Sequence, residues 1–350
     1  HLNLETLKHV KKNMLFIIPN FISKSVEKIL KREGYTNFIK FEFQNYYQFK
    51  KTPLLLTILK SGDFRDDSGL YFTFGEFSFL STVDANNLNG NNFPKDITLL
   101  LSSFAGGGTG YPLCFDLHTI NEKQQIIKRN RKSFRNIVIK NIKSIKPKYY
   151  LPYAGFFSED ANRDLEIKNL NHKNSINDYE SRLSNQIILN VEKKNHYVFK
   201  GTNLVNSEKK YLQYKKEKPE LWISKHSKKA SLSHEAITTY FLKSCFHSQL
   251  CLYLSLTDDN FNLTDKNFRI NFSKNTPDIH TMNNVVFEKD MLKKTKNNLL
   301  FIKARNDSFI YMIKNRLPWE ELLIGFQCRI YRKPNVYNSD FWFHFTNVYF

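Results

Sequence analysis

Two residues far apart in the chain have the side-chain types that hold a metal ion. His1 opens an amphipathic helical pattern, and Asp84 follows the apolar, strand-like run 79–83. A carboxylate at the carboxyl end of a strand lies where α/β proteins assemble their sites, and its oxygen can bind a cation beside an imidazole nitrogen. Asp84 could equally cap the asparagine-rich turn 85–90, as short polar side chains often do. A metal site and a capped turn therefore both stay open.

A second candidate is the glycine-rich segment 104–112, which follows another strand-like run. Gly106, Gly107 and Gly108 would let the backbone approach a ligand closely and direct N–H groups at a phosphate or carboxylate. The same glycines would also serve a tight turn that requires positive φ angles. Because the segment has neither a P-loop nor a dinucleotide-binding pattern, an anion contact and a structural turn are both open interpretations.

The C-terminal block 317–345 places polar side chains among aromatic residues. Gln327 and Arg329 alternate on a predicted strand, where an amide and a guanidinium could bind a carboxylate or a planar base. An aromatic core that contains one buried arginine is the simpler interpretation. Both interpretations predict that this block is folded.

The cysteines do not form a disulfide framework. A Cys-Phe-His triplet at 245–247, near Cys251, matches half of a Rieske-type ligand set, but the Cys-x-x-His half is absent from the chain. We therefore expect these residues to belong to the core. The four cysteines are scattered, which favours reduced thiols and a cytoplasmic location over a disulfide scaffold.

In the first part of the chain, strand and helix patterns alternate, and these elements must position the candidate residues. Strands are predicted at residues 14–18, 38–43, 54–59, 70–74, 77–83, 97–102 and 149–153. A long basic helix is predicted before Pro147, with Ile127, Phe134, Val138, Ile142 and Ile145 on one face. This order predicts an α/β fold with mixed sheets.

The character of the sequence changes along the chain and predicts three regions. Residues 1–160 carry the alternating pattern, 161–235 form a polar, loop-rich insertion or linker, and 236–350 form an aromatic-rich α+β region. In the last region, helices are expected near 235–244 and 307–315, and strands at 250–256 and 268–272.

The composition excludes several classes of protein. The 350 residues are 41% hydrophobic and include 31 Phe and 18 Tyr, which is typical of a globular and not a disordered chain. No apolar run approaches the roughly 18 residues of a membrane-spanning helix. The formal net charge of +20 favours anionic ligands. Because no nucleic-acid-binding motif is present, we do not expect a nucleic-acid partner.

Three segments, in order along the chain, resemble one enzyme family. The similarity is to sequence motifs of the CMP-N-acetylneuraminate hydroxylase family, and the segments are Phe104–Pro112, Lys148–Phe157 and Trp319–Phe345. The resemblance is weakest near residues 160–300. It implies a metallo-β-lactamase-like αββα sandwich, truncated at its N-terminus, with a C-terminal α+β extension. Family members join this domain to a Rieske iron–sulfur domain. They use O₂ and electrons from a redox partner to hydroxylate the N-acetyl group of a nucleotide-activated sialic acid.

The resemblance also implies roles for single residues. His1 resembles the last histidine of the His-x-His-x-Asp-His motif, and Asp84 matches the strand-end aspartate that bridges metals. Asp63 stands where a further histidine is expected, and Tyr153 replaces the last one. These departures imply a mononuclear iron or zinc site, or none, in place of a dinuclear zinc site. The earlier motif residues and the Rieske cluster are expected to lie upstream of His1, outside this chain.

The resemblance implies that the chain is the C-terminal portion of an O₂-dependent hydroxylase with an electron-transfer partner. Its anionic nucleotide-sugar substrate would contact Gly106, Gly107, Gly108, Gln327 and Arg329. Two alternatives stay open: a metal-dependent hydrolase of a phosphodiester or lactone, and a non-catalytic binding remnant. Whether the chain is an enzyme by itself is also open.

Overall fold

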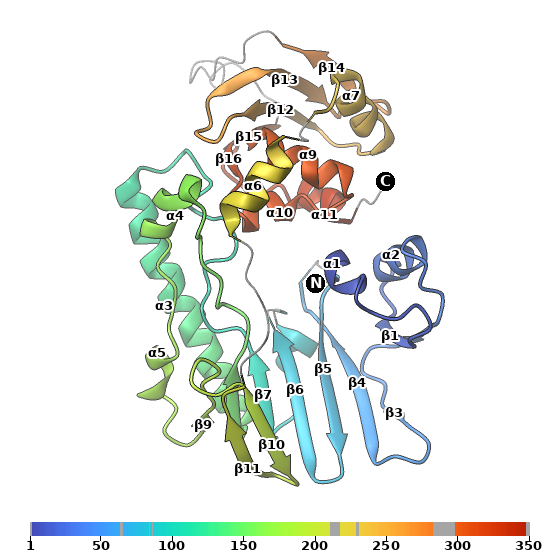
Figure 1. Ribbon diagram of the computed structural model, residues 1–350, viewed down its shortest axis with the longest axis vertical. Coiled ribbons are helices and arrows are strands. Elements are labelled where there is room, and N and C mark those ends of the chain that lie inside the picture. Colours follow the sequence, from blue (N-terminus) through green and yellow to red (C-terminus); the bar gives the residue numbers. More distant parts are fainter. Residues whose placement is uncertain are drawn as a thin grey trace. The chain divides into compact units, whose positions relative to one another are not determined.

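The computed structural model describes residues 2–63, 66–83, 85, 87–210, 218–228, 231–282 and 298–347. The chain divides into two compact units, whose elements are labelled in Figure 1. Unit 1 consists of residues 1–106, 130–157 and 173–214, and unit 2 of residues 107–129, 158–172 and 215–350. The chain thus alternates between the units. The predicted division at residues 160 and 235 stays a prediction about domain organisation.

Unit 1 is built on a seven-stranded mixed sheet in the order β3-β4-β5-β6-β7-β8-β9. The strands are β3 (Tyr47–Gln48), β4 (Leu54–Lys60), β5 (Ser68–Phe74), β6 (Phe77–Val83), β7 (Leu99–Ser102), β8 (Tyr149–Pro152) and β9 (Ile187–Ile188). Neighbours from β3 to β6 are antiparallel, and those from β6 to β9 are parallel. The mixed α/β prediction and the strands expected here are confirmed, with shifts of one or two residues at their ends.

Smaller elements complete unit 1. They are α1 (Leu4–Leu7), β1 (Phe16–Pro19), α2 (Ser25–Arg32), β2 (Phe38–Phe41), η1 (Leu88–Asn91) and α5 (Asn177–Glu180). β1 and β2 pair in parallel as a separate two-stranded sheet. A second two-stranded sheet is the antiparallel hairpin of β10 (His196–Lys200) and β11 (Asn203–Glu208). β9, β10 and β11 lie in the region that the sequence predicted to be loop-rich.

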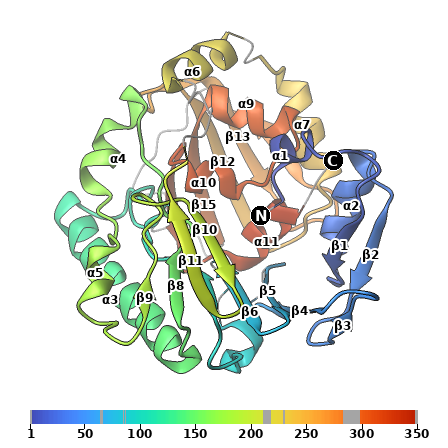
Figure 2. The same ribbon diagram turned by 60° about the horizontal axis from the view of Figure 1, so that its bottom comes forward.

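The two faces of the large sheet are covered by different elements. On one face, Val138, Ile142 and Ile145 of α3 (Ile120–Ile145) share a buried cluster with Leu100 and Tyr150. The opposite face packs in part against the β10–β11 hairpin, whose Tyr197 and Phe199 join Leu99 and Tyr149. Figure 2 shows α3 and the hairpin beside β8. The predicted amphipathic helix is thus confirmed, because its apolar stripe is the buried one.

Unit 2 contains a five-stranded sheet in the order β14-β13-β12-β15-β16. The strands are β12 (Leu250–Thr257), β13 (Leu263–Asn271), β14 (Asp278–Thr281), β15 (Asn298–Arg305) and β16 (Cys328–Lys333). β12 and β15 are parallel, and the other neighbours are antiparallel. The helices are η2 (Asn162–Asp164), α4 (Leu165–Leu170), α6 (Pro219–Ser227), α7 (His234–Lys243), α9 (Asn306–Lys314), α10 (Glu320–Ile324) and α11 (Ser339–Asn347).

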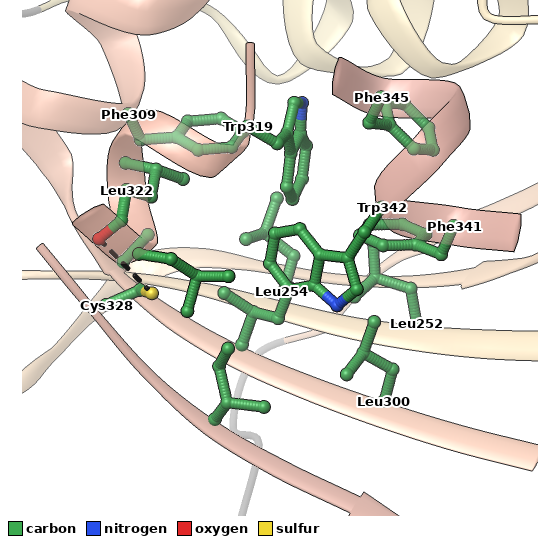
Figure 3. Packing of buried hydrophobic residues seen from close by; sticks show 14 of the residues in the cluster. Leu252, Leu254, Leu300, Phe309, Trp319, Leu322, Cys328, Phe341, Trp342 and Phe345 are labelled. Carbon is green, nitrogen blue, oxygen red and sulfur yellow. Dashed lines mark hydrogen bonds between the residues drawn. The ribbon is translucent and has the colours of Figure 1, made fainter. Parts of the chain in front are cut away.

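Alternation along the strands divides the side chains of unit 2 between two faces. Leu252, Leu254 and Leu300 enter a large buried cluster, in which Trp319 and Trp342 are at most 2% exposed. Figure 3 shows Phe309 of α9, Trp319, which precedes α10, and the aromatic side chains of α11 packed over these leucines. The predicted aromatic C-terminal core is therefore confirmed.

One core prediction needs correction. Phe246 and Cys251 are buried as expected, but Cys245 and His247 are exposed. The triplet lies in the connection between α7 and β12. Of the triplet, only the Phe246 side chain is buried. The prediction that all of these residues belong to the core was therefore wrong.

Within the described ranges, every helix is too short or too polar to cross a lipid bilayer.

Candidate functional site

The predicted metal ligands lie only partly within the described chain. His1 and Asp84 are outside the described residues, so their predicted convergence stays a prediction. Asp63 is half-buried in the loop after β4, and its Oδ1 accepts a hydrogen bond from the Ser61 hydroxyl at 3.0 Å. In the part of the chain that the structure describes, no group of three or more His, Cys, Asp or Glu side chains could hold a metal ion. The described residues by themselves do not form a metal site, so we assign no reaction step to a metal.

The loop that carries Asp63 lies directly against the turn that follows β6. A Cβ atom on Gly62 would lie 2.8 Å from the backbone oxygen of Asn87, closer than any side chain tolerates. Glycine is therefore required for this approach of the two backbones. The contact brings Asp63 next to a turn that lies within a few residues of Asp84 in the sequence.

Two of the segments that carry the family resemblance meet beyond the carboxyl ends of β7 and β8. Gly155 has a φ of +124°, and a Cβ atom there would lie 2.5 Å from the Cβ of Ala105. The rings of Phe104 and Phe156 are 4.9 Å apart between centroids. The Tyr179 hydroxyl donates a hydrogen bond to the Phe104 carbonyl at 2.6 Å. The sheet edge at which α/β proteins usually bind ligands is therefore formed by these segments.

The glycine-rich segment forms turns that require glycine. Gly106, Gly107 and Gly110 have φ angles of +68°, +83° and +70°, whereas Gly108 lies outside this left-handed region. The Asn171 side-chain amide donates a hydrogen bond to the Gly107 carbonyl at 3.1 Å. The predicted positive φ angles are confirmed at Gly106 and Gly107. An anion contact at Gly106, Gly107 and Gly108 stays a prediction.

Gln327 lies at the centre of a polar network in unit 2. Its Oε1 accepts hydrogen bonds from Arg163 Nη2 at 2.9 Å and from Arg305 Nη1 at 3.1 Å. Its Nε2 donates to Asp164 Oδ2 at 3.3 Å and to the Gly325 carbonyl. The amide therefore links two arginines to a carboxylate, and its position is fixed by the protein itself. Direct contact of Gln327 with a substrate stays a prediction.

Two buried arginine–carboxylate pairs hold this network together. Arg305, only 2% exposed, pairs with Asp164. Arg163 Nη1 lies 2.6 Å from Asp307 Oδ2 and 2.7 Å from the more exposed Asp259 Oδ1. Burial alone would raise the pKa of the Asp307 carboxyl, but the charge and hydrogen bond of Arg163 hold this pKa below its ordinary value. Asp307 is therefore an ionised partner, which buried guanidinium groups need.

The network ends at an aromatic ring that two arginines share. Phe261, in the connection between β12 and β13, has a φ of +62°. The Arg305 and Arg329 Cζ atoms lie 4.6 Å and 4.0 Å from its ring centroid. Asp258 fixes this connection by accepting the backbone N–H of Asn262 at 2.9 Å. The ring thus takes part in two cation–π contacts, which orient both guanidinium groups.

Arg329 differs from the two paired arginines. It is half-buried, and its Nη1 donates to the backbone carbonyls of Phe326 at 3.4 Å and Cys328 at 3.1 Å. Among the described residues, no carboxylate forms an ion pair with it. Burial lowers the pKa of the nearby Lys123, with the positive charge of Arg329 acting in the same direction and Asp116 acting against it. The positive charge of Lys123 is thus opposed by the carboxylates of Asp116 and Glu166, and its Nζ donates to the Leu113 carbonyl at 3.0 Å. Arg329 is the cation of this pair that suits an anion.

Several residues of this arrangement were missed by the sequence analysis. Arg163 lies in the region predicted to be loop-rich, and no local pattern marks it or Phe261. Arg305 did carry a usable signal, because it follows the strand-like run 299–304, which is apolar except for Lys303. A charged residue in a buried strand implies a buried partner, although the sequence does not say which one.

The chain is similar in sequence to CMP-N-acetylneuraminic acid hydroxylases. The relative from Xenopus laevis is 28% identical in an alignment of length 294 that covers 76% of this chain and 47% of the relative. The relative from Pongo pygmaeus is 29% identical in an alignment of length 300 that covers 80% of this chain and 49% of the relative. The resemblance found in the sequence is thus confirmed. The chain spans about half the length of these curated relatives. No family model matches the chain.

Solved structures give weaker similarity. The metallo-β-lactamase-fold protein YhfI of Bacillus subtilis superposes with a TM-score of 0.29 and 14% identity, covering 53% of this chain and 67% of that one. The diiron β-hydroxylase CmlA of Streptomyces venezuelae gives a TM-score of 0.24 and 14% identity, covering 36% and 27%.

Proposed function

We propose that this chain is the substrate-binding portion of an O₂-dependent hydroxylase that acts on the N-acyl group of a CMP-activated sialic acid or a closely related nucleotide sugar. The observation that carries the proposal is the sequence similarity to hydroxylases of that name over 76% to 89% of the chain. Because the chain spans about half of those proteins, the complete reaction would require the rest of the protein, a Rieske cluster and an electron-transfer partner.

The chemistry of the substrate matches the Arg329 guanidinium of unit 2. A CMP-activated sialic acid has a phosphate and a carboxylate, and both are acceptors for a guanidinium group. Arg329 would donate to one of these anions from Nε and Nη2, because its Nη1 is already directed at backbone carbonyls. Phe261 holds the guanidinium plane from one side, which lowers the entropy that is lost when the anion binds.

The paired arginines have a supporting role in this proposal. Arg305 contacts the same Phe261 ring and is itself fixed by Asp164. Gln327 immediately precedes β16, the strand that carries Arg329. The network would therefore keep Arg329 and Phe261 in place before substrate arrives. His1, Asp63 and Asp84 are proposed as metal ligands on the basis of the family resemblance, and no step is assigned to a metal.

The proposal is tested by binding of CMP-N-acetylneuraminic acid to the full-length protein, measured by calorimetry. Loss of a charge-assisted hydrogen bond costs about 1.5–3 kcal/mol, so Arg329→Ala is expected to weaken binding about tenfold or more. Arg332→Ala is the matched control, because Arg332 is on the same strand and its guanidinium already contacts Phe115 and Asn335. Equal affinity of the two variants would remove Arg329 from the site.

Catalysis is tested separately. The full-length protein, supplied with O₂ and a reductant, is expected to add one oxygen atom to the N-acyl group, detected by mass spectrometry of the product. Hydrolysis of the nucleotide sugar without added oxygen would contradict a hydroxylase and favour a metal-dependent hydrolase.

A further inference from the structure

Unit 1 contains a cavity of about 540 Å³ next to the end of α3. Its lining includes four cationic side chains, Lys143, Lys146, Lys148 and Arg182, and a single carboxylate, Asp96. Neutral polar side chains, including Asn185, and two apolar residues complete the lining. The volume falls in the range of about 300–1,000 Å³ that is typical of small-molecule sites.

The positive charges come from two separate segments, residues 143–148 and the turn that holds Arg182. Lys143 is in the last turn of α3 and Lys146 follows it, where positive charge is favourable near the helix C-terminus. That explanation does not extend to Lys148, which precedes β8, or to Arg182, which follows α5. Lys148 donates a hydrogen bond to the Asn203 side chain at 2.7 Å. All four cationic side chains are exposed, and in the described ranges of the chain none of them forms an ion pair.

The cavity lies at the sheet edge opposite Phe104 and Gly155, although its Lys148 is the first residue of the segment Lys148–Phe157. Lys148 directly precedes β8, and Gln186 directly precedes β9, so the lining belongs to the amino ends of these parallel strands. Phe104 and Gly155 lie beyond the carboxyl ends of β7 and β8. A strand rises about 3.3 Å per residue, so the length of β8 separates the two edges by roughly 10 Å. The cavity is therefore a different place from the expected ligand edge of unit 1.

We propose that this cavity binds a small ligand that bears two or more negative charges on phosphate groups. Convergent lysines and an arginine match phosphate oxygens in charge and in hydrogen-bond donors. Asn185 and its polar neighbours offer further donors. Pro147 and Ile97 close the apolar part of the wall, and both are buried. The proposal does not depend on the hydroxylase function, because no residue of unit 2 takes part in it.

Titration calorimetry of the full chain with inorganic pyrophosphate tests this site. Lys143→Gln/Lys146→Gln is expected to bind pyrophosphate at least about tenfold more weakly than the wild type, because it removes two charge-assisted contacts. Lys132→Gln/Lys140→Gln is the matched control: it removes two exposed lysines of α3 that do not line the cavity. Arg182→Gln provides an independent variant outside α3 and is expected to weaken binding as well.

The outcomes are distinct. Retained binding in the control with loss in both cavity variants supports the site, and circular dichroism verifies that each variant is folded. No binding of pyrophosphate by the wild type at millimolar concentration overturns the proposal. An equal loss in the control pair also overturns it, because the effect would then reflect the net charge of the chain and not this cavity.

Discussion

Replacing Arg305 by methionine is expected to destabilise unit 2 strongly. Methionine keeps much of the side-chain volume but removes the guanidinium group. In the native protein this group is paired with Asp164 and donates to the carbonyls of Arg163 at 2.7 Å and Asp259 at 3.0 Å. The substitution leaves the Asp164 carboxylate, only 7% exposed, with Gln327 as its remaining side-chain donor at 3.3 Å.

The size of the effect follows from leaving a charge buried. Breaking a buried ion pair by removing one partner costs about 3–5 kcal/mol, a large fraction of the 5–15 kcal/mol that stabilises a typical domain. Arg329→Met removes the same charge from the neighbouring strand, but Arg329 is half-buried and has no carboxylate partner among the described residues. Its hydrogen bonds and ring contact are expected to contribute only about 1–2 kcal/mol.

Urea unfolding followed by tryptophan fluorescence measures the difference. All three tryptophans of the chain, Trp222, Trp319 and Trp342, are in unit 2, so the signal reports this unit. The double variant Arg305→Met/Asp164→Asn is expected to recover part of the loss, because an unpaired amide costs less to bury than an unpaired carboxylate.

The result that would refute the reasoning is a loss for Arg305→Met no larger than that for Arg329→Met. In that case the Arg305–Asp164 pair would contribute no more than a half-buried arginine. A double variant that is less stable than Arg305→Met would equally contradict a buried, uncompensated carboxylate as the cause.

Two further predictions concern carboxylates. Arg163 depresses the pKa of Asp307 in the folded protein, against the effect of burial. The ionised Asp307 therefore stabilises the folded state fully above the ordinary aspartate pKa, which is near 4. This stabilisation is lost as the pH falls through the lower pKa that Asp307 has in the folded state. The stability gap between wild type and Asp307→Asn in urea unfolding is therefore expected to be full at pH 7 and to shrink below about pH 4; a gap that does not change with pH would contradict this. The proposed role of Asp63 as a metal ligand predicts that Asp63→Asn lowers the iron or zinc content of the full-length protein, measured by elemental analysis, whereas Asp67→Asn, in the same loop, does not. Equal metal content in both variants would remove Asp63 from the ligand set.

Most elements could be predicted because their signals are local. The apolar spacing of Val138, Ile142 and Ile145 predicted the buried face of α3, and all three are buried. The run 250–256 predicted β12, which the structure places at Leu250–Thr257. The region 161–235 was harder, because its strands and helices are short and their apolar partners lie elsewhere in the chain. Tyr197 and Phe199, for example, pack against Leu99 and Tyr149.

The candidate site was likewise only partly predictable from the sequence. Arg329, Gln327 and the glycines were found because residue type and neighbours in the sequence mark them. Their partners were not found, since Arg305 and Asp164 are 141 positions apart and Arg163 and Asp307 are 144 positions apart.

The sequence by itself determined many of the helices and strands outside residues 161–235, the apolar face of the long helix, and which enzyme family the chain resembles. Only the tertiary structure decided which charges are neutralised and which are not. The physical reason is that hydrophobic periodicity depends only on residues close together in the sequence. Whether a buried charge is neutralised depends on partners that folding brings from distant parts of the chain. That difference separates Arg305, which is paired with Asp164, from Arg329, whose charge is left for a ligand in the proposed function.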